Sequence, residues 1–490
     1  MIPDMLGFMR HTNTTESLHE SLRSGRLVSV FGKKDGEHKL SIHYVVDAGA
    51  SGYQFFQFAV DRPVTSITPI TPAAAWYERE VHDQYGIEIL GHPDLRPLVL
   101  HENWPEGVHP MVTAVGSVPW ASGLYPFLEV LGDGVCEVAV GPVHAGIIEP
   151  GHFRFSVMGD RVIHLELRHF YTHKGTEKLF EQSPVARGTL IAESVSGDNC
   201  FAHAVAYCQA VEKAFGVQVP PRAAAIRLVG IELERMLAHV ADVGALCGDV
   251  GFTVPAAYAS RIKEDLLRVS AACVGTRYWR GIATPGGVNR DLLSAAASSL
   301  AAAVERASGE FASLARKVLN TASVQNRFEG AGVLLPNVAR DLAVVGVVAR
   351  ASGIALDVRR DHPYGAYTEH VPDLPVFHYG DVLARARVRI EEAVVSAQLI
   401  TKIAANLPSG PTCSAVDFEK DAQGFSAVES PRGELLYWVS CRRGQIARCH
   451  IKSPSFQNWP ALPFAVADNV IADFPLINKS FNLSYSGCDR

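Results

Sequence analysis

Residues 194–208 read SVSGDNCFAHAVAYC, a turn that leads directly into a helix-forming run. The Gly-Asp-Asn turn is followed by apolar residues at helical spacing. Cys200 and Cys208 are too far apart to form the Cys-x-x-Cys pair found in many metal sites. The stretch therefore has the setting of a metal-binding segment without the ligands of one.

Length and composition exclude several classes of protein. A chain of 490 residues exceeds one typical domain, so two or three are expected. The net charge of −6 argues against nucleic-acid binding, and no run of about eighteen apolar residues predicts a transmembrane helix. The first residues lack the basic start and apolar run of a secretory signal. Nine scattered cysteines, an odd number, favour a reducing compartment over a disulfide framework.

Hydrophobic periodicity divides the chain into two regions. Residues 1–125 mix strand-like runs (26–32, 39–48, 53–60) with a helix-like run (73–86), which predicts a small α/β domain. Residues 136–146 and 152–170 suggest a hairpin, with Gly159-Asp160 as the turn. Long helices are then predicted over 201–215, 220–248, 256–275, 289–319 and 381–406, with strands over 425–454. We predict an α+β fold, with a small N-terminal domain (1–125) and a large, mainly helical domain with short sheets (126–490).

Common catalytic motifs are missing from the sequence. It contains no GxxxxGK[ST], HExxH, GxSxG or CxxC, and Glu137 stands where a GxGxxG motif needs its third glycine. Three compact charged clusters remain, at 149–154, 359–362 and 429–432, and the first is predicted to place Glu149, His152 and Arg154 in one short turn. Taken alone, each cluster is more typical of a hydrogen-bonded loop anchor than of a catalytic group.

The order of these clusters along the chain resembles one family. Residues 76–100 look like the signature of the small peripheral-arm subunit of respiratory complex I. GPVHAGIIEPGHFRF, FAHAVAYCQAVE, ASGIALDVRRDHPYGAY, ESPRG and ADFPL look like successive blocks of a hydrogenase large subunit. The whole chain thus resembles the large subunit of membrane-bound (group 4, formate hydrogenlyase-type) nickel–iron hydrogenases and, more distantly, fused complex I peripheral-arm subunits.

The resemblance implies a nickel–iron centre held by four thiolates, in an RxCGxC and a DPCxxCxxR segment. In this chain the four cysteine positions fall on Ser196, Asn199, Ser484 and Gly487. Soft, charged sulfur is what nickel and low-valent iron require, and a four-ligand site supplies on the order of 10 kcal/mol of binding. We therefore expect no metal in this chain and iron–sulfur clusters in a partner subunit. Ending at Arg490, without the tail that the family cleaves after nickel loading, fits that expectation.

Other residues of the family's site are retained. Glu149 matches a glutamate that relays protons, Arg432 matches the arginine over the metal's diatomic ligands, and Arg359 and Asp361 match a charged pair nearby. Without metals, these groups are expected to form a buried charge network. It persists either for structure alone or because it still conducts protons.

Two cysteines, Cys200 and Cys488, each lie one position beyond a lost ligand. One step along a helix turns a side chain by ~100°, so neither thiol is expected to point where its neighbour did. The two interpretations are small buried thiols that pack as hydrophobic groups and a two-thiol redox or metal site.

Quinone recognition has weaker support in the sequence. The quinone-binding tyrosine of the complex I relative falls on Gly197, and His152 is the nearest candidate for its partner histidine. The family's histidine before Trp438 is Tyr437 here, and its ERLHSH pattern is also altered.

These observations predict a nickel-free component of a complex I-related oxidoreductase, which the resemblance connects with quinone and NAD chemistry. The expected partners are a small iron–sulfur subunit and antiporter-like membrane subunits, and the expected place is cytoplasmic, peripheral on the inner face of the cell membrane. The alternatives are a quinone-reducing subunit that uses the vacated cavity, a non-redox assembly scaffold and, with least support, an active hydrogenase.

Overall fold

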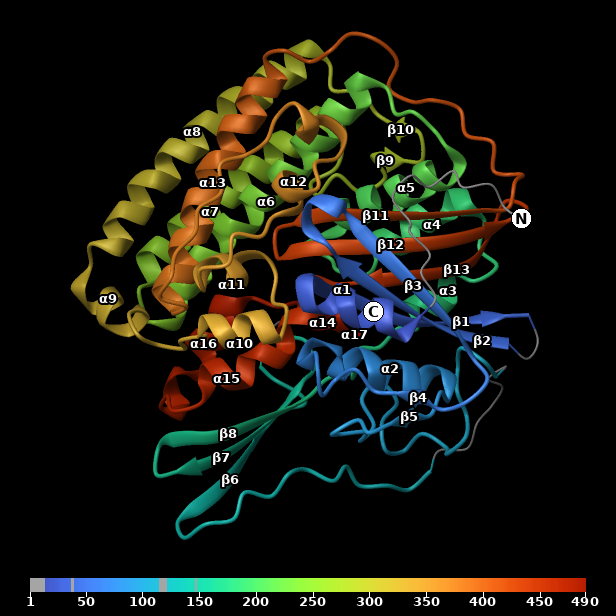
Figure 1. The fold of residues 1–490 in the computed structure, drawn as a ribbon. Helices are drawn as coiled ribbons and strands as arrows, with labels where there is room; N and C mark the ends of the chain where they lie inside the picture. The colour runs from blue at the N-terminus through green and yellow to red at the C-terminus, as the bar shows by residue number, and fades with distance from the viewer. Residues whose placement is uncertain (1–13, 37–38, 114–120, 146–147) are drawn as a thin grey trace.

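The structure of the chain is a computed structural model that describes residues 14–36, 39–113, 121–145 and 148–490. The first thirteen residues, where the sequence predicts no secretory signal, lie outside these ranges, as do 114–120. Figure 1 shows long helices on one side of the molecule and small sheets on the other.

The N-terminal region is built on an antiparallel sheet of order β1-β2-β3. Its elements are α1 (Thr15–Ser24), β1 (Arg26–Asp35), β2 (Lys39–Asp47), β3 (Tyr53–Val60) and α2 (Ala75–Tyr85), with a short parallel pair, β4 (Val64–Thr65) and β5 (Ile89–Leu90). Alternate side chains of the strands point to opposite faces. Leu27 and Val46 therefore join one core, whereas Val28 and Val45 join the other.

A second antiparallel sheet follows, made of β6 (Val135–Val140), β7 (His152–Met158) and β8 (Arg161–Arg168). The hairpin at Gly159-Asp160 is confirmed, and residues 135–140 add a third strand that the sequence did not predict as a pair of β7. The prediction that Glu149, His152 and Arg154 share one turn is wrong. The last two lie two positions apart on β7, because alternating apolar residues there favour a strand.

The helical body contains α5 (Cys200–Phe215), α6 (Pro221–Asp249), α7 (Thr253–Val274), α8 (Ser294–Leu319) and α13 (Val382–Ala404). Pro221 opens α6 as predicted, and Asp381 caps α13 by accepting the Ala384 N–H. The α6 helix packs along α13 and α7, with α8 on the outside (Figure 1).

Short elements connect these helices to the end of the chain. They are α3 (Thr176–Phe180), α4 (Gly188–Glu193), β9 (Ala283–Thr284), β10 (Gly287–Val288), α9 (Ala322–Phe328), α10 (Pro336–Asp341), α11 (Gly346–Ala351), α12 (Val358–Asp361), α14 (Pro454–Asn458), α15 (Leu462–Val466), α16 (Phe474–Phe481) and α17 (Tyr485–Asp489).

A third antiparallel sheet, β11 (Ala422–Ser430), β12 (Gly433–Arg442) and β13 (Gln445–Lys452), lies between the two regions. The α5 helix packs on β11 and β12, and aromatic residues of the N-terminal sheet also contact these strands. Phe55 meets Phe425 with ring centroids 4.8 Å apart, and Phe31 meets Trp438 at 5.2 Å. The predicted α+β class is confirmed, while the boundary at residue 125 stays a prediction.

Candidate site at the substituted ligand positions

Two segments that are far apart in sequence meet beside the start of α5. Ser196 Oγ lies 3.1 Å from Ser484 Oγ, and Ser484 caps α17 by accepting the Gly487 N–H at 2.8 Å. A Cβ atom placed on Gly487 would lie 3.0 Å from Ser484 Oγ and 3.5 Å from the Ser196 Cβ. Three of the four substituted positions are therefore in direct contact.

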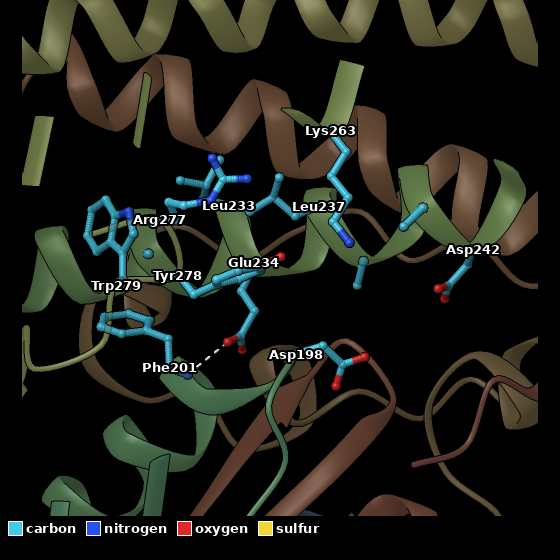
Figure 2. Close-up of a pocket in the computed structure, with 13 residues that line it drawn as sticks. Asp198, Phe201, Leu233, Glu234, Leu237, Asp242, Lys263, Arg277, Tyr278 and Trp279 are labelled. Carbon is cyan, nitrogen blue, oxygen red and sulfur yellow. Dashed lines mark hydrogen bonds between the residues drawn. The ribbon is translucent and has the colours of Figure 1, made fainter. Parts of the chain in front are cut away.

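The fourth position, Asn199, precedes α5 without capping it. Its side chain is buried, and Oδ1 has no hydrogen-bond partner among the described residues. Glu234 of α6 caps the helix instead, accepting the Phe201 N–H at 2.7 Å and the Ala202 N–H at 3.0 Å (Figure 2). Burial raises the pKa of Glu234 to about 8, although the two N–H donors favour the carboxylate.

A small cavity adjoins this cap. Figure 2 shows Asp198, Glu234, Asp242 and Lys263 around it. Its volume of about 40 Å³ has room for about one or two water molecules. It is too small for a quinone ring, and none of the four substituted ligand positions lines it.

Arg432 ties the loop before α5 to the C-terminal segment. Its guanidinium donates to both Asp198 carboxylate oxygens, at 3.0 and 2.7 Å, and to the Asn482 carbonyl at 2.5 Å. Desolvation opposes ionisation of Asp198, but Arg432 outweighs it and lowers the carboxyl pKa to about 2. Because Asp198 is 53% exposed, water screens the pair and reduces its contribution to stability.

Lys174 makes a second tie between the same segments. Its ammonium donates to the carbonyls of Ser194 and Val195, both at 3.0 Å, and to Ser486 Oγ at 2.5 Å. The Ser486 hydroxyl donates in turn to the Val195 carbonyl at 2.8 Å. A cation thus joins the two segments that carry metal ligands in the family that this chain resembles.

Glu149 fastens the C-terminal segment from another side. One of its carboxylate oxygens accepts the Ser486 N–H at 2.8 Å. The arginines of the first and third charged clusters pair elsewhere: Arg154 with Glu137 at 3.2 Å, and Arg432 with Asp198. Glu149 and Arg432 therefore both reach the site without pairing with each other.

Arg359 belongs to a separate buried network. It donates to Asp357 at 2.9 and 2.6 Å and to Glu232 at 3.0 Å, rather than to Asp361. Asp361 accepts the Asp357 N–H at 2.9 Å, and burial raises the pKa of Asp361. The ionisable members of the network, each at most 1% exposed, are Glu232, Arg235, His239, Arg350, Asp357, Arg359, Glu392 and Glu429.

The network reaches the site through the backbone. Arg235 donates to the carbonyls of Glu429 and Ser430, at 2.7 and 2.9 Å, at the start of the turn that carries Arg432. The altered ERLHSH pattern around Arg235 is visible in the sequence, but the roles of Glu234 and Lys174 were not predicted from it. Their partners lie 20 residues or more away along the chain, so no short sequence motif contains either residue together with its partner.

The two cysteines have different surroundings. The Cys200 thiol donates to the Tyr278 carbonyl at 3.4 Å, whereas the nearest charges to Cys488 are Asp489 and Arg490. Both are buried free thiols, and burial raises the pKa of each. The geometry supports packing as hydrophobic groups, and a two-thiol site stays a prediction. Across the described ranges, no group of three or more His, Cys, Asp or Glu side chains is arranged to hold a metal ion.

The quinone candidate His152 is buried on β7. Its Nδ1 lies 3.3 Å from the Gly141 carbonyl, and its ring packs at 5.1 Å from that of Phe127. Burial lowers its pKa. Tyr437, which replaces the family's histidine, shares a 2.8 Å hydrogen bond with His203 Nδ1.

Comparison with known proteins places this arrangement in a class of respiratory subunits. Residues 10–115 match the model of the 30 kDa subunit of respiratory-chain NADH dehydrogenase, and residues 249–421 and 416–490 match that of its 49 kDa subunit. In the part of the chain that the structure describes, no helix is both long and apolar enough to cross a membrane.

Individual relatives identify the family of this chain more specifically than the subunit models do. Formate hydrogenlyase subunit 5 of Escherichia coli (strain K12) is 34% identical over 487 residues, covering 96% of this chain and 85% of the relative. Hydrogenase-4 component G of the same organism is 34% identical over 441 residues, covering 88% and 77%. A chain from the structure of the membrane-bound sulfane sulfur reductase, an archaeal respiratory membrane complex, matches with a TM-score of 0.69 at 25% identity, covering 74% of this chain and all of that one. The chain belongs to the family of group 4 hydrogenase large subunits related to complex I.

Proposed function

We propose that this chain is a nickel-free member of its family, which links an iron–sulfur subunit to ion-translocating membrane subunits in a complex I-related oxidoreductase. The observation that carries the proposal is the direct hydrogen bonding between the two former ligand segments. Ser196 meets Ser484, and Lys174 and Arg432 tie the segments on either side. These contacts hold the segments together without a metal.

The donor set does not fit a nickel–iron centre. Two hydroxyls, one amide and one glycine supply none of the thiolates that soft metals require. The Ser484 hydroxyl is already used as a helix cap. No step of the function is therefore assigned to a metal or other cofactor bound by this chain.

Exposed apolar side chains support a docked partner. They lie on the segment before β6, where Leu124 is 94% exposed and Leu131 83%, on β6 itself at Val138, and on the loop after β6, where Val143 is 82% exposed and Ile148 is also exposed. Large exposed apolar patches commonly mark interfaces. We assign this surface to the small iron–sulfur subunit and place the complex on the cytoplasmic, inner face of the membrane, next to antiporter-like subunits.

Quinone reduction is the second candidate, favoured by one observation. His152 Nε2 is buried and has no hydrogen-bond partner among the described residues, which leaves its hydrogen-bonding capacity unused. His152→Phe would then abolish quinone-dependent turnover of the purified complex while leaving assembly intact. Unchanged turnover would exclude this role.

Metal content tests the main proposal. The complex, purified from co-expressed subunits, should contain nickel only at background level and evolve no hydrogen from reduced viologen. Escherichia coli formate hydrogenlyase, prepared in parallel, is the positive control. Near one nickel per chain would overturn the proposal. Expressed alone, the chain should aggregate, and co-expression with the iron–sulfur subunit should rescue it.

Glu149→Gln tests whether the site still handles protons. Glutamine keeps one oxygen to accept the Ser486 N–H but removes the titrating group. If Glu149 relays protons, coupled activity should fall at least about tenfold while assembly survives. Weakened assembly with normal specific activity would show that Glu149 is a structural anchor. No change in either would show that Glu149 has neither role.

A further inference from the structure

A large cavity separates the N-terminal sheet from the helical body. Its volume is about 960 Å³, near the upper end of the roughly 300–1,000 Å³ typical of small-molecule sites. Apolar side chains from β3, α5, α6 and β11 contribute to its wall: Tyr53, Phe55, Val205, Leu228, Ile231 and Phe425. The α5 helix connects the substituted ligand positions to this cavity. Asn199 precedes the helix and Gln209 lines the cavity, and the rise of about 1.5 Å per residue places them about 15 Å apart.

Positive charge gathers at one end of this cavity. The first turn of α6 lines it with Pro221 and Ala224, at the positive end of the helix dipole. Lys213 lies near the end of α5, eight residues before the first residue of α6. Lys402 lies near the end of α13, which is held against the α6 start by a 2.8 Å bond from Arg222 to the Pro408 carbonyl.

Neither lysine has a counter-charge. Both lysine side chains are exposed to solvent at the rim of the cavity, and in the ranges that the structure describes no carboxylate lies within ion-pair distance of either ammonium. Glu212, in the same wall, is engaged by Arg227 at 2.5 Å. Gln209 Oε1 is also buried without a partner among the described residues.

The remaining acids of the cavity belong to a different element. Asp361 ends α12 and Glu369 follows it eight residues later, and Asp361 already accepts the Asp357 N–H. His362 and His370 line the same part of the wall, so the unpaired positive charge of the cavity is on the two lysines and at the start of α6. The apolar wall would hold a ring or chain, and the charge pattern fixes which end carries the acid group.

We propose that this cavity binds an amphipathic organic anion, an aryl or long-chain carboxylate or sulfonate, whose acid group pairs with Lys213 and Lys402 and whose apolar part lies on the wall of Tyr53, Phe55, Ile231 and Phe425. The site is independent of the proposed electron-transfer role. It adjoins the buried network, because Tyr367 in its wall donates to Glu232 at 2.5 Å. Ligand binding should therefore also raise the unfolding temperature.

Two fluorescent probes test the proposal on the purified complex: 1-anilinonaphthalene-8-sulfonate and the neutral N-phenyl-1-naphthylamine, which lacks the sulfonate. The sulfonate should bind saturably at one site per chain. Lys213→Gln/Lys402→Gln should weaken the sulfonate about tenfold or more and leave the neutral probe within about twofold. Lys317→Gln, on the exposed face of α8, should change neither.

A bulky substitution tests whether the probes bind in this cavity or on other apolar surfaces. Ala224→Trp fills the cavity from the half-buried start of α6 and should abolish saturable binding of both probes. An unchanged thermal transition, without probe, confirms that each variant is folded. Equal sulfonate affinity in wild type and the double lysine variant would overturn the proposal. So would the absence of any saturable site in the complex, which would mean that a partner polypeptide fills the cavity.

Discussion

Two polar regions of this molecule are built differently: the four substituted ligand positions and the buried network around Arg359. At the former ligand segments, short neutral side chains meet through single hydrogen bonds, with Arg432 and Lys174 at the margin. In the network around Arg359, carboxylates and guanidinium groups are almost completely buried and paired with opposite charges, while burial lowers the pKa of His239 and favours its neutral form.

The difference shows which polar groups a fold can lose. A loop or helix end can exchange a thiolate for a hydroxyl, because the replacement needs only one new hydrogen bond. A buried charge cannot be deleted alone, since its partner is then left uncompensated. Burial by itself would raise the pKa of Glu232, yet Arg359 lowers it to about 2. Packing is therefore a sufficient reason to retain Arg359 without a metal.

Removing Arg359 should cause the largest loss of unfolding free energy among the variants that we propose. Arg359→Met leaves Asp357 and Glu232 without their shared cation, so we expect a loss of about 3–5 kcal/mol in unfolding free energy. Urea unfolding of the co-purified complex measures it. Arg360→Met is the matched control, because Arg360 is exposed on the same short helix and should cost less than about 0.5 kcal/mol. Equal losses in the two variants would contradict the assigned network.

Lys174→Met should have the next largest effect. It removes three hydrogen bonds from an ammonium at the partly exposed edge of the site, and about 1–2 kcal/mol should be lost. Lys178→Met removes only a surface ion pair to Glu181 and is the control. If both variants unfold at the same urea concentration, the hydrogen bonds of the Lys174 ammonium contribute nothing to stability and the segments are held by packing.

The ion pair between His362 and Asp47, 2.9 Å apart, joins the two regions of the chain and should depend on pH. Burial disfavours the imidazolium, but Asp47 outweighs it and raises the His362 pKa above 6.5, while Arg26 and His362 lower the Asp47 pKa below 3.8 despite burial. The contribution of His362 is therefore complete below pH 6.5 and is lost as pH rises through its folded pKa. That of Asp47 is lost as pH falls below about 4.

His362→Gln should accordingly cost about 1 kcal/mol at pH 6 and progressively less toward pH 9, as measured by unfolding at several pH values. Glu434 and Asp361 also face His362, but neither changes the sign. His19→Gln on α1 is the control, because no carboxylate within the described residues pairs with it. A cost that stays constant from pH 6 to pH 9 would rule out an ionised pair.

Ser196→Ala should have the smallest effect. It removes one hydroxyl from the contact with Ser484, worth about 0.5–1 kcal/mol. Ser484→Ala should cost more, because it also removes the cap on α17. Ser196 Oγ also donates to Asp198 at 3.2 Å, so the reverse order of the two losses would show that this bond contributes more than the helix cap.

The fold could be predicted from sequence where patterns are local. The long helices and the sheet that carries Arg432 follow from periodicity, and Pro221 and Asp381 mark helix starts. The sequence placed residues 136–146 beside the predicted hairpin, but only the structure shows that β6 pairs with β7. Glu234 was not predicted, because its cap on α5 spans 33 residues. A resemblance supplied the candidate positions, but only the folded chain shows which groups share a partner.

The close contact at Gly487 has a consequence for the evolution of the chain. Any side chain restored there would place its Cβ 3.0 Å from Ser484 Oγ, tighter than most such contacts, so the neighbours would have to yield by a few tenths of an ångström. A single cysteine regained at this position would crowd the junction while still lacking three other thiolates to bind metal. A four-thiolate site at this junction would therefore require several substitutions made together, with rearrangement around Gly487, rather than one change alone.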